Sequence, residues 1–274
     1  MSVLDKKRLF DRVPAGAALD GRLAALSGGE SEDVLLLLHG LGATADVWRR
    51  CLERLPAFWP GRWLAPDLPG HGSSPWTHRY AAGAQAAAIA QLVPDGQRVY
   101  VLAHSLGGAL GVLLASNWFG IDVRAVVAFG VKVNWSAQER VVMARRASAS
   151  PKAFASRDEA VDFYLKVSGL AGLVLRDDPV AAYGVLEDAT GWRLAADPAT
   201  ACVGALPVAS MLAVANCPVV LAAGRLDPMV GIDELRGLGH TAVDLGAVGH
   251  NPHVENPERV LDLIRHLTDA GAEI

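Results

Sequence analysis

The chain has 274 residues, of which 51% are hydrophobic, and it carries a formal net charge of −4 with a mean hydropathy of +0.26. This length can bury a sizeable core and suits one α/β domain with an insertion, and the composition excludes a disordered chain. The acidic balance argues against a nucleic-acid partner, which usually requires a basic patch.

The cysteines and the apolar runs indicate in which cellular compartment we expect the protein. Cys51, Cys202 and Cys217 are odd in number and their spacing matches no zinc motif. No apolar run approaches the ~20 residues of a membrane span, and residues 1–8 are too polar for a signal peptide. We therefore expect a cytoplasmic monomer or homodimer without a membrane span, and we expect no metal and no cofactor.

Strand-like apolar runs alternate with helical patterns through the first half of the chain. The strand candidates are, in order, 8–13, 22–26, 34–38, 63–65, 99–102 and 124–130. Helical patterns lie at 46–52, 81–92 and 106–119. The run at 34–38 is apolar without alternation, as in a parallel strand covered on both faces, whereas the first two candidates are weak and suit edge strands. The alternation predicts an α/β fold with a mostly parallel central sheet flanked by helices.

The pattern changes after Val131. Two capping boxes and one Asp-Pro pair mark successive helix starts, at 136–139, 156–159 and 178–179. We expect residues 132–210 to form an all-helical lid, inserted into a core domain made of 1–131 and 211–274. The core is expected to resume with strands at 218–224 and 241–245 and to end with a helix that begins near Pro257.

A serine stands at an abrupt turn between a predicted strand and a predicted helix, in the stretch 99–111. Such a turn strains the serine backbone, so the residues two before and two after it must be small, and here they are Ala103 and Gly107. The turn would lift the hydroxyl of Ser105 above the sheet. It would also put the N–H of Leu106 in the first turn of a helix, where an oxyanion can be held.

This stretch resembles the nucleophile elbow of the α/β-hydrolase superfamily, Gly-x-Ser-x-Gly, with Ala103 in place of the first glycine. Asp227 and His250 each follow a later strand, in the chain order Ser, Asp, His of that superfamily. In the resulting triad, Ser105 is the nucleophile, His250 takes and returns its proton, and Asp227 fixes the imidazole tautomer. The competing acids and histidines are Asp233, Glu234, His240 and His253.

The stretch His39-Gly40-Leu41-Gly42 resembles the His-Gly oxyanion loop of the same superfamily. The resemblance implies that the backbone N–H of Leu41 is the second oxyanion donor beside that of Leu106, and that Gly40 lets the backbone approach the substrate. We expect His39 to support this loop by hydrogen bonding, and His71 and His104 to be structural neighbours of the site. Dehalogenases and epoxide hydrolases of similar fold carry aspartate at the position of Ser105, which disfavours both activities.

The resemblance extends from residue 34 to residue 267 and implies a lid-bearing serine esterase. Large lid side chains are candidates to face a substrate or to pack the lid onto the core: Trp135, Met143, Phe154, Phe163, Tyr164 and Trp192. The predicted substrate contacts are Gly40, His104, Trp135, Phe163 and Trp192.

The mostly apolar lid favours a small to medium hydrophobic ester, lactone or thioester as the small-molecule partner. Two alternatives are a carbon-carbon bond hydrolase of the meta-cleavage-product type, with Arg193 as a lid cation, and a non-catalytic ligand receptor on the same fold.

Overall fold

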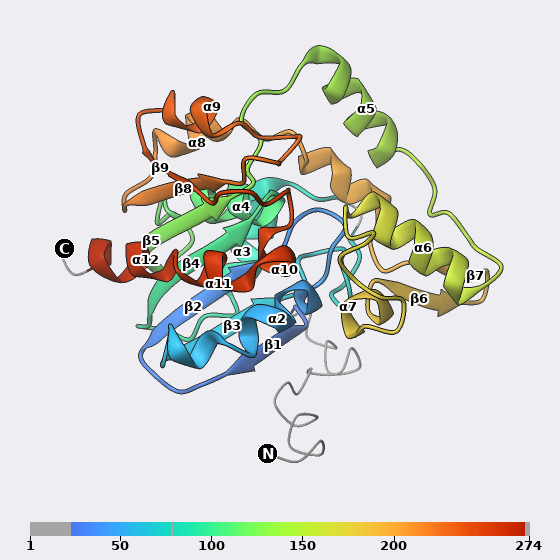
Figure 1. Ribbon diagram of the computed structural model, residues 1–274, viewed down its shortest axis with the longest axis horizontal. Coiled ribbons are helices and arrows are strands. Elements are labelled where there is room, and N and C mark those ends of the chain that lie inside the picture. The colour runs from blue at the N-terminus through green and yellow to red at the C-terminus, as the bar shows by residue number, and fades with distance from the viewer. Residues whose placement is uncertain (1–22, 78, 272–274) are drawn as a thin grey trace.

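The computed structural model describes residues 23–77 and 79–271 (Figure 1). Seven strands form one sheet in the order β1-β3-β2-β4-β5-β8-β9, and every neighbouring pair is parallel except β1 with β3. The strands are β1 Ala25–Gly28, β2 Asp33–Leu38, β3 Arg62–Pro66, β4 Arg98–His104, β5 Asp122–Phe129, β8 Val219–Ala223 and β9 Thr241–Asp244. The predicted mostly parallel sheet is therefore confirmed.

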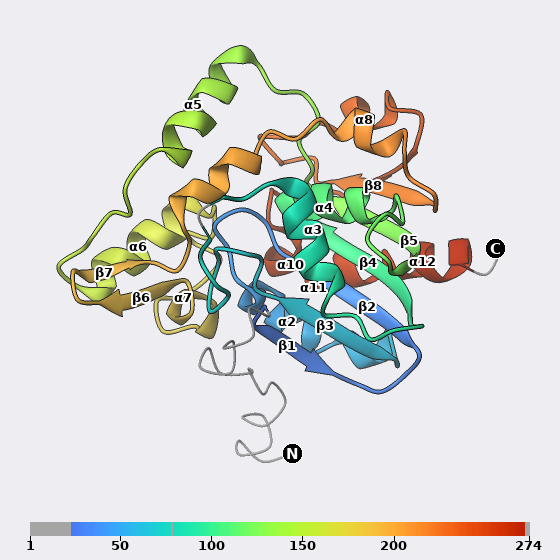
Figure 2. The same cartoon turned by 180° about the vertical axis from the view of Figure 1, so that it is seen from behind.

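The central strands are apolar on both faces because helices cover both faces of the sheet (Figures 1 and 2). One face carries α3 Ala82–Ala90, α4 Leu106–Leu114, α8 Val208–Leu212 and α9 Ile232–Arg236. The other face carries η2 Ala45–Trp48, α2 Arg49–Leu52, η3 Leu55–Ala57, α10 Pro252–Glu255, α11 Pro257–Leu261 and α12 Ile264–Gly271. The last helix predicted from Pro257 is thus divided into α11 and α12.

The register of the central strands brings several loops to one edge of the sheet. β2 pairs with β4 as far as Leu38↔Ala103, and β4 pairs with β5 as far as His104↔Phe129. Because the strands are parallel, their carboxyl ends meet, and the segments after Leu38, His104 and Phe129 lie next to one another.

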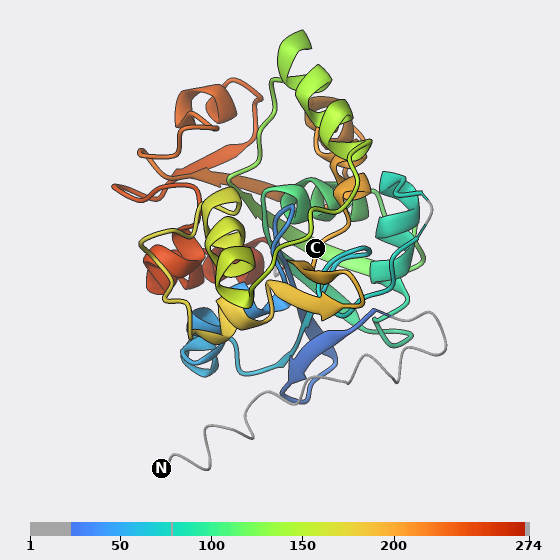
Figure 3. The same ribbon diagram turned by 90° about the vertical axis from the view of Figure 1, so that its right-hand side faces the viewer.

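The excursion between β5 and β8, called here the β5–β8 segment (residues 132–210), lies in front of this edge in Figure 3. It holds α5 Ala137–Ala147, α6 Arg157–Val167, α7 Pro179–Ala182, β6 Val185–Asp188, β7 Gly191–Leu194, η4 Pro198–Val203 and the start of α8. The prediction that this segment is all-helical is wrong, because β6 and β7 form an antiparallel hairpin from Val185↔Leu194 to Asp188↔Gly191. These strands have four residues each and contain charged or polar residues, so they leave no apolar run to find.

The strand predicted at 22–26 corresponds to β1, which lies at the edge of the sheet and begins three residues later than the prediction. The candidate at 8–13 lies outside the described residues. Within 23–77 and 79–271, no helix has both the length and the apolar character that crossing a bilayer requires.

Candidate active site

Ser105 caps the amino end of α4 in a conformation that is rare for a residue with a side chain, with φ 51° and ψ −115°. Its N–H donates to the carbonyl oxygen of Phe129 at 2.9 Å, which ties the turn to the end of β5. Gly107 explains the need for small neighbours: a Cβ there would lie 2.5 Å from the carbonyl oxygen of His39. The strained turn is therefore fixed by close packing of α4 against the end of β2.

Asp227 and His250 come from the loops after β8 and β9 and meet side chain to side chain. His250 Nδ1–H donates to Asp227 Oδ2 at 2.8 Å, and the N–H of Met229 donates to Asp227 Oδ1 at 2.8 Å. The Asp227 side chain is only 1% exposed, whereas that of His250 is 19% exposed. Because Nδ1–H donates to the carboxylate, Nε2 is the ring nitrogen left to accept a proton.

The backbone around His250 is held from two sides. Both oxygens of Glu255 accept backbone N–H groups of the loop, from Gly249 at 2.7 Å and from Asn251 at 3.3 Å. On the opposite side, His104 Nε2–H donates to the carbonyl oxygen of His250 at 2.8 Å. Burial keeps the pKa of His104 well below its usual range, so this ring stays neutral.

The side chain of Asn251 links this loop to the β5–β8 segment. Its amide nitrogen donates to the carbonyl oxygens of Ser168 at 3.0 Å and Gly169 at 3.2 Å, which directly follow α6. The position after the histidine therefore fastens the carboxyl end of α6 to the loop that carries His250.

Two buried imidazoles hold the loop 39–42. His39 Nε2 accepts from Leu68 N–H at 2.9 Å and its Nδ1–H donates to the Gly40 carbonyl at 2.8 Å, while His71 Nε2 accepts from Gly42 N–H at 3.0 Å. Burial lowers the pKa of His71 to about 3, which keeps the acceptor nitrogen free of a proton.

Gly40 has a steric reason of its own, since a Cβ there would lie 2.9 Å from His104 Nδ1 and 3.2 Å from Ser105 Cβ. The loop can therefore approach the serine this closely only with glycine at that position.

Ser105 and His250 line a common cavity of about 330 Å³, called here the Ser105 cavity. Five other predicted site residues line it as well: Gly40, Leu41, His104, Leu106 and Trp135. Leu41 and Leu106 carry the two predicted oxyanion donors, and no hydrogen bond among the described residues uses either N–H. The cavity also has walls that the sequence patterns did not single out for the site, namely Lys132, Arg146, Lys166 and Asn251.

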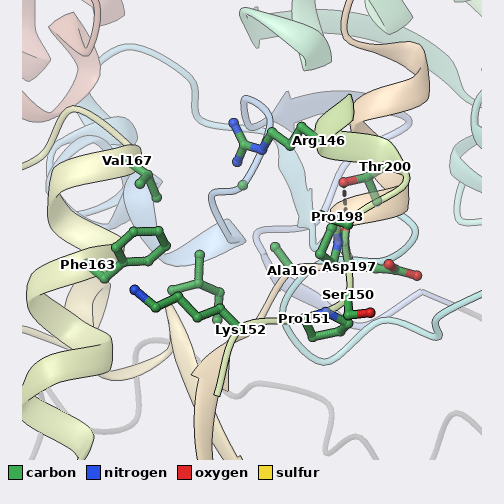
Figure 4. Close-up of a pocket in the computed structure, with 13 residues that line it drawn as sticks. Arg146, Ser150, Pro151, Lys152, Phe163, Val167, Ala196, Asp197, Pro198 and Thr200 are labelled. Atoms are coloured by element: carbon green, nitrogen blue, oxygen red, sulfur yellow. Dashed lines mark hydrogen bonds between the residues drawn. The ribbon is translucent and has the colours of Figure 1, made fainter. Parts of the chain in front are cut away.

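Phe163 and Trp192, both predicted to contact substrate, do not line the Ser105 cavity. Phe163 lines a second cavity of about 340 Å³, called here the Phe163 cavity (Figure 4). Trp192 lines neither cavity, and its backbone pairs with that of Phe154 beside β7. Arg193 is engaged elsewhere, in an ion pair with Asp188 at 2.5 Å and over the ring of Trp76 at 4.0 Å.

The alternative acids and histidines have other surroundings. Asp233 is exposed and pairs with Arg236 at 2.8 Å, and Glu234 accepts a hydrogen bond from Asn134. His253 is fully buried, and its ring lies 5.0 Å from that of Trp48. In the described part of the chain, Asp227 is the acid with a hydrogen bond to His250.

Comparison with known proteins shows that residues 35–263, most of the chain, match an alpha/beta hydrolase family. The chain is 38% identical over 85 residues to Lipase LipV of Mycobacterium tuberculosis, an alignment that covers 30% of this chain and 31% of the lipase. It is 39% identical over 81 residues to the pimeloyl-[acyl-carrier protein] methyl ester esterase of Neisseria meningitidis, covering 30% of this chain and 25% of the esterase. The chain thus matches a third or less of the length of these curated relatives.

Among solved structures, E-2-(acetamidomethylene)succinate hydrolase superposes with a TM-score of 0.73 at 20% sequence identity. The superposition covers 95% of this chain and 99% of that one. At this identity the likeness establishes a common fold.

Proposed function

The chain belongs to the alpha/beta hydrolase family, and from that premise we propose that it is a serine hydrolase that cleaves small to medium hydrophobic carboxylic esters through an acyl-enzyme. One observation carries the proposal. The 2.8 Å hydrogen bond from His250 Nδ1 to the buried Asp227 leaves Nε2 as the ring acceptor, and His250 shares a cavity with the strained Ser105.

The proposed reaction begins when Nε2 of His250 takes the proton of the Ser105 hydroxyl as the oxygen attacks the ester carbonyl. The negative charge that forms on the carbonyl oxygen would be held by the N–H groups of Leu41 and Leu106, the latter in the first turn of α4. The carbon–oxygen bond to the alcohol then breaks, and the alcohol leaves with the proton from His250.

Water completes the proposed cycle. His250 takes a proton from the water as its oxygen attacks the acyl carbon, and the Ser105 oxygen regains that proton when the acid departs. Throughout, Asp227 would keep Nδ1 protonated and stabilise the imidazolium form of His250.

We also assign the β5–β8 segment as a lid over the site. Support comes from its side chains in the Ser105 cavity, which come from α5, from the residues that precede it and from the end of α6. A cavity of about 330 Å³ lined by Trp135, Met143 and Leu206 suits a short or medium apolar acyl group. Ester cleavage is also the reaction in the name of the Neisseria relative.

Carbon-carbon bond hydrolysis is the weaker proposal for this site. The cation assigned to it from the sequence, Arg193, is paired with Asp188 and does not line the Ser105 cavity. A vinylogous diketone therefore serves as the contrasting substrate in the activity assays.

The direct test is covalent labelling by a small fluorophosphonate, followed by intact-mass measurement. The wild type is expected to gain one adduct, and Ser105→Ala is expected to gain none. Ser168→Ala is a matched control because Ser168 lines the same cavity while its hydroxyl donates to the Tyr164 carbonyl at 2.7 Å. It should label like the wild type.

Hydrolysis of 4-nitrophenyl esters and of the diketone then defines the reaction. Activity on the esters and none on the diketone supports the proposal. A folded wild-type protein that neither labels nor hydrolyses any ester would refute it.

A further inference from the structure

The Phe163 cavity adjoins the Ser105 cavity rather than forming a separate site. Arg146 of α5 and Val167 of α6 line both cavities, so the two spaces share a wall of two side chains. Figure 4 shows the Arg146 side chain reaching from α5 toward Val167, with Phe163 and Lys152 below it. The Phe163 cavity is therefore close enough to the Ser105 cavity to be considered for the far end of a substrate whose ester lies at Ser105.

Arg146 of α5 has no ion-pair partner within residues 23–77 and 79–271. Among the described residues no carboxylate forms an ion pair with it, whereas Arg49 and Arg193 each pair with an aspartate within 2.7 Å. A Cβ on Gly42 would lie 3.5 Å from Arg146 Nη2, which places the guanidinium beside the loop that carries Leu41. Arg146 is exposed to solvent, and the atoms that crowd its guanidinium still lower its pKa by desolvation.

The other charges of the two cavities add to this positive character. Lys152 lines the Phe163 cavity with its ammonium 4.6 Å from the centre of the Phe163 ring, and Lys166 lines the Ser105 cavity. Asp197 is the one acid among the described lining residues of both cavities. Its Oδ1 accepts from Ala199 N–H at 3.0 Å and its Oδ2 from the Tyr80 hydroxyl at 2.8 Å, and its one negative charge stands against the two positive charges of Arg146 and Lys152 in the Phe163 cavity.

The remaining walls of the Phe163 cavity are mostly apolar, including Pro151, Phe163, Val167, Leu194 and Pro198. A mostly apolar cavity with one guanidinium, one ammonium and one carboxylate keeps an excess of positive charge, which favours a ligand of the matching pattern, a hydrocarbon chain that ends in an anion. The two cavities thus carry an excess of positive charge, although the whole chain has a net charge of −4.

We infer that the Phe163 cavity is the subsite for an anionic group at the end of the acyl chain of the substrate, and that Arg146 binds this group. The inference rests on the proposed ester hydrolysis and narrows its substrate to esters whose acyl chain ends in a carboxylate or in a phosphorus oxyanion. Lys152 would supply a second, weaker contact.

The kinetic test compares three 4-nitrophenyl esters of the same chain length: hexanoate, the monoester of hexanedioic acid, and a hexanoate with a terminal phosphonate. For the wild type, we expect kcat/KM to be about tenfold or more higher for at least one anionic ester than for the neutral ester, as a charge-assisted contact with a guanidinium allows. This preference should disappear in Arg146→Gln and should weaken at high salt. The larger of the two preferences identifies the anion.

Arg145→Gln is the matched control, because Arg145 is the neighbouring cation on α5 and lines neither cavity. It should keep the wild-type preference. A wild type that hydrolyses the neutral ester as fast as both anionic esters would overturn the inference and leave the proposed function standing. Equal losses of preference in Arg145→Gln and Arg146→Gln would overturn it too, because they would indicate a general field effect.

A binding experiment decides the matter independently of hydrolysis. Monomethyl hexanedioate and methyl hexanoate are titrated into Ser105→Ala, and the same pair into the double variant that also carries Arg146→Gln. Tighter binding of the anionic ester, at least about tenfold and lost with Arg146, supports the subsite. Equal binding of the two esters refutes it, even if the wild type proves to hydrolyse no ester at all.

Discussion

Helices α4 and α5 line the same cavity, yet α4 is buried in the core and α5 is exposed on the surface. In α4 every residue except Leu113 is buried, and Ser105 at its start is held in a strained conformation by close packing on β2 and β5. In α5 no residue is buried, although Met143 and Arg146 reach the cavity. The proposed chemistry is thus attached to a buried and tightly packed helix, and the proposed selectivity to an exposed one.

The largest expected effect is on catalysis and comes from a substitution of Asp227. Asp227→Asn should reduce kcat/KM for a 4-nitrophenyl ester by about ten-thousand-fold, because the amide no longer fixes the tautomer of His250 and no longer offsets its charge. Circular dichroism should show a folded protein. Asp233→Asn is the control, since Asp233 is exposed and pairs with Arg236. If the loss occurred in Asp233→Asn instead, the assignment of the acid would be wrong.

A smaller effect is expected from packing beside the serine turn. Gly107→Ala should lower the free energy of unfolding by about 3 kcal/mol and reduce fluorophosphonate labelling, because the new Cβ would lie 2.5 Å from the His39 carbonyl oxygen. Gly83→Ala in α3 is the control, since a Cβ there meets no atom within 4 Å. That change should stabilise the protein by about 0.5–1 kcal/mol, measured by urea unfolding. Similar behaviour of the two variants would contradict the packing argument.

The buried histidines should make the stability of the core depend on pH. Burial lowers the pKa of both His71 and His253 from 6.5 to about 3. Protons therefore bind the unfolded chain more strongly between these values. The stability that the neutral rings provide is complete above about pH 6.5, and it should fall by about 1 kcal/mol per pH unit for each histidine as the pH drops toward about 3.

His253→Leu tests this effect, because neither ring nitrogen of His253 has a hydrogen-bond partner among the described residues. The variant should lose less stability than the wild type between about pH 7 and about pH 5, measured by urea unfolding. His240→Gln, outside this buried cluster, should keep the wild-type slope. An unchanged slope in His253→Leu would show that His253 does not contribute to it.

The smallest effect is expected on the free energy of unfolding, for a substitution in the exposed helix α5. Val142→Ala in α5 should change the free energy of unfolding by less than about 0.5 kcal/mol, because Val142 is 54% exposed. Val112→Ala in α4 removes the same two methyl groups from a fully buried position and should cost about 2 kcal/mol. Equal costs would mean that α5 contributes to the core as α4 does.

The features of the tightly packed core could be predicted from the sequence, whereas those of the β5–β8 segment could not. The turn at Ser105, the loop 39–42 and the order of Asp227 and His250 leave local traces, since strain and close approach demand small residues at fixed positions. The pairing of β6 with β7, the place of Phe163 in a second cavity and the approach of Arg146 to Gly42 leave none. They depend on how the β5–β8 segment lies on the core, which is a tertiary property of side chains far apart in the sequence.

The exposure of α5 has a consequence for how such an enzyme diversifies. Substitutions at Met143 and Arg146 alter the wall of the proposed substrate space without removing anything from the core, so a population of variants can change there at little cost in folding. The hydrogen bonds from Asn251 to the residues after α6 meanwhile hold the part of the wall that α6 provides in a fixed position relative to His250. Random libraries confined to α5 should therefore yield folded variants in which the proposed selectivity of this wall can be altered.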